Sequence, residues 1–401
     1  MVEWKKLGEV AFYYRGVTYN KKQEVSLNSG GTKILRANNI DLRTNTINLD
    51  DLKEISADVR IKEYQWLLPN DILICAGSGS KEHIGKVAYI SEKIGYAYGG
   101  FMGKLVTSEK LSSRYLFHVI TSMLFKKYLE KALNSTTINN LNSEIIYNFI
   151  IPIPSLSEQN RIVGILDTFT ASVENLKEQI TQRRKQYNRY LDKLYYPSKL
   201  ELLDASKRGE IDVKTLDELG TFTRGRRFVR TDIVPEGVPC IHYGDMYTYY
   251  GIWADKTPTH LTKEISEKLR FAQKGDVVVV AAGENDIDIG VGVAWLSDED
   301  VVVHDACFIF KHNQNPKYLS YYLRSNNYHQ QIRMGVVDGK ICSISAKELG
   351  RTLIAVPSLE EQSRIVSILD TFEASIVNLE AQLKEREKQY EYYRNKLLTF
   401  E

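Results

Sequence analysis

Two stretches of this chain, 203 residues apart, are nearly the same sequence. Residues 154–194 and residues 357–397 align without a gap, and 25 of their 41 positions are identical. An internal repeat of this length indicates that the 401-residue chain consists of two copies of one unit, each ending in the repeated stretch. Each element inferred for one half should therefore have a counterpart in the other half.

Both repeated stretches predict a long helix. Each begins with a proline followed by Ser-x-x-Glu, which fits a capping box starting at Ser155 and at Ser358. From 162 to 194, and from 365 to 397, apolar residues recur at alternating steps of four and three. This heptad spacing predicts a coiled-coil seam on a helix about 60 Å long.

The two helices are expected to pair within one chain, because an intramolecular partner is always nearby; pairing between two chains is the alternative. Only residues 195–213 or so separate the first helix from the second globular part, so the second helix runs back antiparallel to the first. Net charges of +3 for residues 154–199 and −3 for residues 357–401 agree with this pairing. One seam position is arginine in both copies, Arg183 and Arg386, and either sets the register or extends its charged head out of the seam.

Positions away from the seam suggest two copies of one partner. Helix pairing requires only the seam to match, yet 17 of the 31 other positions are also identical between the copies. Two like outer surfaces related by an approximate two-fold axis favour one partner per helix; a recent duplication is the alternative. The candidate partner-binding residues are Glu158, Gln159, Asp167, Asn175, Glu361, Gln362, Asp370 and Asn378.

The remainder of each half predicts a mixed domain with short strands first and helices mainly toward its end. The halves align weakly but in order, so that Asp71-Ile-Leu-Ile corresponds to Asp276-Val-Val-Val and "NFIIPIPS" to "RTLIAVPS". We therefore predict an α+β fold: two homologous globular α/β domains joined by two long antiparallel helices in a coiled coil, with pseudo-two-fold symmetry. The predicted segments are 1–153 (first domain), 154–199 (first helix), 200–356 (second domain) and 357–401 (second helix).

Loop chemistry in both domains points to nucleic acid. The second domain has four arginines between residues 224 and 230, followed by a segment rich in His and Tyr. The first domain contains "YYRG", "RANN" and "GSGSKEH". Arginine reads guanine and clamps phosphate, asparagine reads adenine, and lysine adds salt-dependent affinity. Taken singly each patch also fits a solvated loop, but two such domains on a rigid spacer favour a reader of two separated DNA sites.

Other functional classes have little support. No apolar run is long enough to span a bilayer, and the first ten residues lack the apolar segment of a signal peptide. The four scattered cysteines form no C-x-x-C pair, which fits a reduced, cytoplasmic protein. The glycines at 77–85 have the wrong spacing for a phosphate-binding loop, and no methyltransferase, hydrolase or nuclease motif is present. We therefore expect neither a catalytic centre nor a metal site in this chain.

The complete arrangement resembles the specificity (S) subunit of a type I restriction-modification system. The pattern P-S-L-x-E-Q-x-R-I-V-x-I-L-D closes each of two variable domains, and residues 225–248 and 274–296 are similar to target-recognition domains of that family. The resemblance implies that each domain reads one half of a bipartite target in double-stranded DNA and that the helices set the unread gap. Two modification (M) subunits, which methylate adenine, would dock on the helices, and restriction (R) subunits would complete the complex.

The resemblance also implies where the chemistry lies. S-adenosylmethionine, ATP and Mg²⁺ would belong to partner subunits, and this chain would bind no cofactor. The implied base or phosphate contacts, second domain first, are Arg224, Arg226, Arg227, Arg230, His242, Tyr243, Lys340, Arg15, Lys21, Lys22, Arg36, Asn38, Asn39 and Lys81. The alternative is a non-enzymatic coiled-coil scaffold whose end domains bind protein or small ligands, and salt-sensitive binding of duplex DNA separates the two hypotheses.

Overall fold

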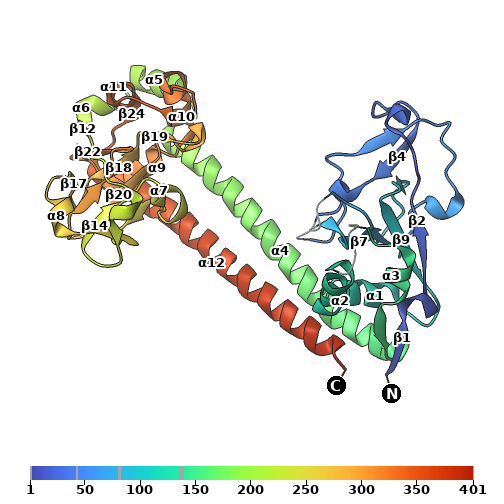
Figure 1. Ribbon diagram of the computed structural model, residues 1–401. Helices are drawn as coiled ribbons and strands as arrows, with labels where there is room; N and C mark the ends of the chain where they lie inside the picture. The colour runs from blue at the N-terminus through green and yellow to red at the C-terminus, as the bar shows by residue number, and fades with distance from the viewer. Residues whose placement is uncertain (1, 42–43, 80–82, 135–139, 401) are drawn as a thin grey trace. The chain divides into compact units, whose positions relative to one another are not determined.

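The computed structural model describes residues 2–41, 44–79, 83–134 and 140–400 (Figure 1). By packing, the chain divides into an N-terminal unit, Met1–Lys177 with Ala381–Glu401, and a central unit, Glu178–Glu380. Each unit therefore contains one globular domain and part of both long helices.

Strands of the N-terminal unit form two four-stranded sheets, in the orders β2-β9-β6-β7 and β3-β5-β4-β8, and a two-stranded pair, β1-β10. The strands are β1 (Glu3–Lys6), β2 (Ala11–Arg15), β3 (Glu24–Val25), β4 (Thr32–Leu35), β5 (Lys53–Ile55), β6 (Ile72–Cys75), β7 (Val87–Tyr89), β8 (Ala97–Tyr98), β9 (Met102–Thr107) and β10 (Ile150–Ile153). The short helices are α1 (Ser113–Ile120), α2 (Met123–Asn134) and α3 (Ser143–Tyr147). Strand β6 is buried at every residue, which its continuous apolar sequence allows.

Strands of the central unit form two five-stranded sheets, in the orders β12-β22-β18-β20-β15 and β13-β16-β14-β21-β17, and the pairs β11-β24 and β19-β23. The strands are β11 (Val213–Thr215), β12 (Gly220–Arg224), β13 (Ile233–Val234), β14 (Val238–Ile241), β15 (Trp253–Ala254), β16 (Thr259–Leu261), β17 (Phe271–Ala272), β18 (Val277–Val280), β19 (Ala282–Gly283), β20 (Gly292–Trp295), β21 (Val301–Val303), β22 (Cys307–His312), β23 (Cys342–Ser343) and β24 (Leu353–Ala355). The short helices are α5 (Lys199–Lys207), α6 (Leu216–Leu219), α7 (Asp245–Thr248), α8 (Lys263–Ser266), α9 (Pro316–Tyr322), α10 (Asn326–Ile332) and α11 (Ala346–Gly350).

The two domains share one strand order. The series β2, β9, β6, β7 corresponds to β12, β22, β18, β20, and the parallel pair β4–β8 corresponds to β14–β21. The central domain adds β15 and β17 at sheet edges. The structure thus confirms the predicted α+β fold with two homologous domains.

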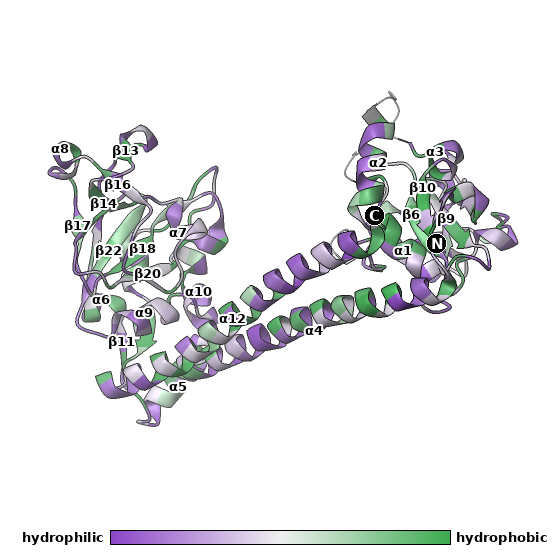
Figure 2. Ribbon diagram, turned by 90° about the horizontal axis from the view of Figure 1, so that it is seen from below, coloured by the Kyte–Doolittle hydropathy of each residue, from purple (hydrophilic) through white to green (hydrophobic). Residues whose placement is uncertain are grey.

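Both repeated stretches form the predicted helices, α4 (Leu156–Tyr195) and α12 (Leu359–Leu398), each of 40 residues. Polar and apolar residues alternate along both of them (Figure 2). At the start of α4 the Glu158 amide donates to Ser155 Oγ at 3.3 Å, as a capping box requires. The Glu158 carboxylate, however, accepts hydrogen bonds from Arg161 at 2.6 and 2.7 Å. The structure therefore shows the serine half of the predicted box.

In the N-terminal unit the two long helices pack antiparallel. The Phe169 ring of α4 stacks on Tyr393 of α12 with centroids 5.2 Å apart, and further along Lys177 Nζ lies 3.4 Å from Glu387 Oε1. The Arg386 guanidinium carbon lies 5.7 Å from the centre of the Phe169 ring. The polar seam residue thus contacts the facing helix through a cation–π interaction.

The central unit repeats this packing with the helices exchanged. The Tyr190 ring of α4 lies 5.1 Å from that of Phe372 in α12, and Arg184 Nη2 lies 2.5 Å from Glu380 Oε1. The Arg183 guanidinium carbon lies 5.8 Å from the centre of the Phe372 ring. Antiparallel pairing is confirmed in both units. Each seam arginine lies over an aromatic ring of the facing helix. The sequence pattern predicts instead that it sets the register or extends out of the seam.

The ends of the long helices belong to the cores of the domains. In the N-terminal unit, Ile162 near the start of α4 and Leu398 at the end of α12 are buried in one apolar cluster. The central unit buries their counterparts, Ile365 near the start of α12 and Tyr195 at the end of α4. Each domain core is therefore completed by the beginning of one helix and the end of the other.

Candidate nucleic-acid interface

Four predicted contact residues of the first domain line one hollow of about 800 Å³. Arg15 is the last residue of β2, and Lys21 begins the short turn Lys21–Gln23. Arg36 and Asn38 lie at the turn that follows β4. The fold therefore gathers cations and an amide from three separate segments, as a surface that binds phosphate and base edges requires.

Arg36 and Asn38 are held by one acidic residue. Arg36 Nη2 lies 2.7 Å from Asp51 Oδ2, and Asn38 Nδ2 donates to the same oxygen at 3.1 Å. The hydrogen bond from Asn38 and the charge of Arg36 lower the pKa of Asp51, so this carboxylate is ionised at neutral pH. Asp51 thus orients both predicted contact residues and offsets part of the positive charge of the hollow.

The prediction for Asn39 is wrong. Its side chain is completely buried, accepts a hydrogen bond from the Arg36 amide at 2.8 Å and donates to the Asn48 carbonyl at 2.9 Å. Asn39 therefore stabilises the turn that carries Asn38 and cannot reach DNA. Lys22 is exposed but does not line the hollow, and Lys81 lies outside the described residues.

One aromatic residue that the sequence pattern does not single out lines the same hollow. Phe101 lines it beside Arg15, and its side chain is 73% exposed. A large exposed apolar ring among cations is suited to contact with a base or a thymine methyl group. Because Phe101 follows two glycines in an otherwise apolar segment, sequence pattern alone does not separate it from a core residue.

All four predicted arginines of the central domain are exposed. Arg224 Nε donates to the Asp305 carbonyl at 2.8 Å, and Arg226 Nη1 donates to the Lys268 carbonyl at 2.7 Å. These bonds hold the start of the arginine segment in place while both side chains remain exposed. Arg227 and Arg230 carry no such hydrogen bond within the described part of the chain.

His242 and Tyr243 lie next to the arginine segment in an aromatic cluster with Phe228 and His304. The rings of His242 and Tyr243 are 4.5 Å apart, and those of Phe228 and His304 are 4.9 Å apart. Burial lowers the pKa of His242 and of His304, so both are neutral at pH 7. His242 is therefore more suited to packing and to neutral hydrogen bonding than to holding a phosphate by charge. Lys340 is exposed in the turn before β23, and no described hydrogen bond joins it to the arginines.

The structure corrects the predicted partner-binding surface at Gln159 and Gln362. Both side chains are completely buried. Gln159 Oε1 accepts from the Ser112 amide at 2.8 Å, and Gln362 Oε1 accepts from the Asn315 amide at 3.0 Å. The identity of the two glutamines reflects one shared task, which is to fasten each helix to its own domain.

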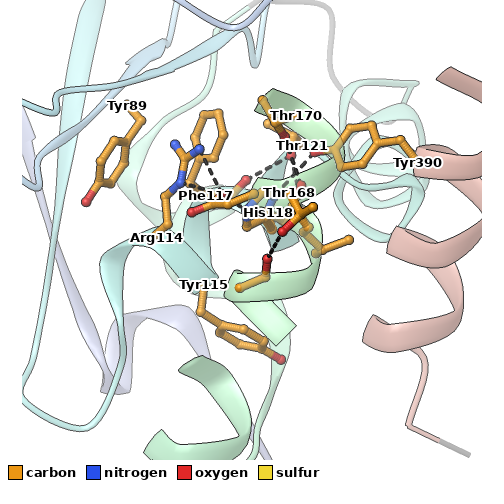
Figure 3. A network of polar contacts seen from close by, with 12 residues as sticks. Tyr89, Arg114, Tyr115, Phe117, His118, Thr121, Thr168, Thr170 and Tyr390 are labelled. Atoms are coloured by element: carbon orange, nitrogen blue, oxygen red, sulfur yellow. Dashed lines mark hydrogen bonds and ion pairs between the residues drawn. The ribbon is translucent and has the colours of Figure 1, made fainter. Parts of the chain in front are cut away.

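Asp167 also has an intramolecular role, in a polar network whose members Arg114, His118 and Tyr390 are labelled in Figure 3. Its Oδ1 accepts from Arg114 Nε at 2.9 Å and lies 2.8 Å from His118 Nε2. On the other side of the imidazole, Tyr390 Oη lies 3.3 Å from His118 Nδ1. Although burial raises the pKa of Asp167, the hydrogen bonds from His118 and Arg114 outweigh this and lower it.

The central unit builds the same anchor with different residues. Asp370 forms an ion pair with Lys317, and its Oδ1 accepts a hydrogen bond from Tyr321 Oη at 2.7 Å. The identity of Asp167 and Asp370 therefore has an internal cause, although both carboxylates remain partly exposed. Of the predicted partner-binding residues, Asn175 and Asn378 are exposed, and Glu158 and Glu361 are half-buried beside a helical arginine.

We expect His118→Gln to reduce the loss of stability in acid. Burial lowers the pKa of His118. Below about pH 6.5 this histidine is therefore protonated in the unfolded chain but remains neutral in the folded protein. The stability present above that pH is lost as the pH falls toward the folded-state pKa. Glutamine keeps a donor for Asp167 but does not titrate.

The test compares Tm at about pH 7.5 and about pH 5 by calorimetry for the His118→Gln variant and the unaltered chain. The variant should lose less of its Tm over this interval. An equal loss in both proteins would show that His118 does not contribute to the acid sensitivity.

Two further features bear on the possible function. Within the described ranges, none of the helices is both long and apolar enough to cross a membrane. No group of three or more His, Cys, Asp or Glu residues among those described is placed to hold a metal ion.

Comparison with known proteins gives consistent matches. The family model for the type I restriction modification DNA specificity domain matches residues 1–183 and again residues 209–388. A putative type I restriction enzyme specificity subunit of Haemophilus influenzae is 29% identical over 313 residues, 73% of each chain. The EcoR124I/EcoR124II specificity subunit of Escherichia coli is 30% identical over 267 residues, 62% of this chain and 63% of that protein.

Solved structures agree in fold. The S subunit of a type I restriction-modification system from M. genitalium matches with a TM-score of 0.54 at 15% identity, over 100% of this chain and 97% of that chain. A chain from a structure of type I restriction-modification complex assembly matches with a TM-score of 0.55 at 18% identity, over 99% and 97%. Together with the two family-model matches, which cover both domains and most of each repeated helix, this identifies the chain as a member of the type I restriction-modification specificity-subunit family.

Proposed function

We propose that this chain reads a bipartite sequence in double-stranded DNA, with one half-site for each domain. The observation that carries this proposal is one strand order presented twice with different exposed loops. Arg15, Lys21 and Arg36 surround a hollow in the first domain, whereas the second exposes a run of arginines. A constant framework with variable loops suits two domains that recognise different bases.

The proposed partners are inferred from exposed residues that are identical in the two long helices. Asn175 of α4 and Asn378 of α12 are exposed counterparts, one in each unit. Two modification subunits would bind at these counterparts, one for each helix repeat, and restriction subunits would join the same complex. S-adenosylmethionine, ATP and Mg²⁺ would then be bound by those subunits, in the cytoplasm, and the paired helices of this chain would set the unread gap between the half-sites.

We expect Arg226→Ala to relax or weaken recognition of one half-site and leave the other unchanged. Arg226 belongs to a single domain, and loss of one guanidinium contact to a base costs about 1–3 kcal/mol of discrimination. The measurement is genome-wide mapping of N6-methyladenine in cells that express the chain with its modification subunit, followed by binding to duplexes with single base changes.

The matched control is Arg208→Ala. Arg208 is an exposed arginine of the same unit, but it lies at the end of α5 and pairs with Glu210 at 2.6 Å. It should leave the motif intact. Equal damage to both half-sites by Arg226→Ala would contradict the assignment of one half-site to each domain, and the absence of any DNA binding by the unaltered complex would favour a scaffold.

A further inference from the structure

We propose that Arg15 and Arg224 are equivalent phosphate contacts, one in each domain, that position the DNA without reading its sequence. The inference rests on the proposed DNA-reading function and assigns a distinct role to two of the predicted contact residues. It is carried by their identical placement in domains whose loops otherwise differ.

Both arginines end the first strand of the corresponding sheet. Arg15 is the last residue of β2 and lies opposite Gly103 of the antiparallel strand β9. Arg224 is the last residue of β12 and lies opposite Phe308 of β22. Because β2 and β12, and β9 and β22, occupy the same places in the two sheets, the two arginines project from the same point of the fold.

A glycine follows each arginine for the same physical reason. A Cβ atom on Gly16 would lie 2.2 Å from the Gly99 carbonyl oxygen, and one on Gly225 would lie 2.3 Å from the His304 carbonyl oxygen. Only glycine permits the chain to pass this close to the neighbouring backbone. The Arg-Gly pair is therefore a structural corner that both domains build alike.

The corner holds each guanidinium by one nitrogen. Arg15 Nε donates to the Gly100 carbonyl at 2.9 Å, and Arg224 Nε donates to the Asp305 carbonyl at 2.8 Å. Both side chains are exposed, and within the described residues their terminal nitrogens donate no hydrogen bond. A guanidinium fixed at Nε presents a preorganised pair of N–H donors, the geometry that suits a phosphate.

The chain diverges directly after the corner. The amides of Val17 and Arg226 donate to equivalent carbonyls, at 2.7 and 3.0 Å, so their backbones match. Val17 is nevertheless buried whereas Arg226 is exposed. A residue that both domains share cannot distinguish two different half-sites, but it can bind the phosphate backbone that every half-site has. Residues found in one domain alone, such as Arg226, are left to read bases.

The test uses Arg15→Gln and Arg224→Gln in the complete chain with its modification subunits. Glutamine keeps an N–H for the corner carbonyl but loses the charge. The probe is a duplex that carries the motif mapped by methylation, with binding measured by anisotropy over a series of salt concentrations. Each variant should weaken binding roughly tenfold, and by the same factor for the motif and for duplexes with one altered base. Each should also reduce the slope of log affinity against log salt by about 0.9.

Controls separate this role from the alternatives. Lys127→Gln removes an exposed charge from α2 and should change neither the affinity nor the salt slope. The proposal would be overturned if Arg15→Gln or Arg224→Gln altered the base preference or left the salt slope unchanged. It would also be overturned if the loss of binding were explained by a lower Tm of the variant. If the unaltered complex bound no bipartite duplex, the proposed function itself would fail.

Discussion

Lys104→Met is expected to lower the free energy of unfolding of the N-terminal unit by about 3–5 kcal/mol, because it leaves a buried carboxylate without its counter-charge. Lys104 Nζ lies 2.8 Å from Asp71 Oδ2 and donates to the Trp66 carbonyl at 2.9 Å. Only 4% of the Lys104 side chain and 6% of the Asp71 side chain are exposed. Methionine fills a similar volume, so the loss measures the unpaired charge more than a cavity.

The central domain shows how the same position is filled without an ion pair. Ile309 of β22 pairs with Val278 of β18 as Lys104 of β9 pairs with Leu73 of β6. Asp276, the counterpart of Asp71, has its pKa raised by burial. An apolar residue at the position of Lys104 is therefore compatible with this fold when the pKa of the neighbouring acid is raised, as it is for Asp276.

Urea unfolding measures the loss, and hydrogen exchange of the β6 and β9 amides locates it in the N-terminal unit. The double variant Lys104→Met with Asp71→Asn should recover part of the stability, because no charge is then left unpaired. Lys22→Met, at an exposed lysine of the same domain, should change the free energy by no more than about 0.5 kcal/mol. Equal stability of the Lys104 and Lys22 variants would contradict the importance of the buried pair.

Gly225→Ala is expected to destabilise the central unit by about 3 kcal/mol and to abolish recognition of its half-site. The new Cβ would lie 2.3 Å from the His304 carbonyl oxygen and 2.4 Å from the Val303 carbonyl oxygen. Both contacts are with backbone, so no side chain can move aside. The strand end must shift, which also displaces Arg224 and Arg226.

Gly251→Ala is the matched control, because a Cβ there meets no atom within 4 Å. It should change stability by no more than about 0.5 kcal/mol and leave methylation unchanged. The measurements are Tm by calorimetry and the methylated motif in cells. A Gly225→Ala chain that retains the complete bipartite motif would show that the corner tolerates displacement.

Much of the scaffold was predictable because its signals are local. Helix α4 and helix α12 follow from a heptad spacing that can be counted along one segment. The correspondence of β6 with β18, and of the segments that contain β10 and β24, follows from short apolar matches in the same order. Such patterns report which face of an element is apolar, and this is enough to predict the element and its pairing.

The sequence predicts which kinds of side chain form the candidate site, but it does not predict which individual residues reach the surface. Within "RANN", Asn38 lines the hollow, whereas its neighbour Asn39 is buried and stabilises the turn. Gln159 looked like part of an outer surface because it recurs at Gln362, yet both glutamines anchor their helices internally. Phe101 is not among the predicted contact residues, yet its exposed ring lines the hollow. Each outcome depends on hydrogen-bond partners far away in the sequence.

The sequence by itself therefore determined that the chain is a duplicated unit with two long helices and two related α/β domains, and that its exposed chemistry suits DNA. Tertiary structure alone decided which of two adjacent asparagines reaches solvent, which identical residues fasten helix to domain, and that Arg15 and Arg224 occupy one equivalent corner. The physical reason is that periodicity and composition are properties of a segment. Burial and hydrogen-bond partnership, in contrast, arise only when distant segments such as β2 and β9 meet.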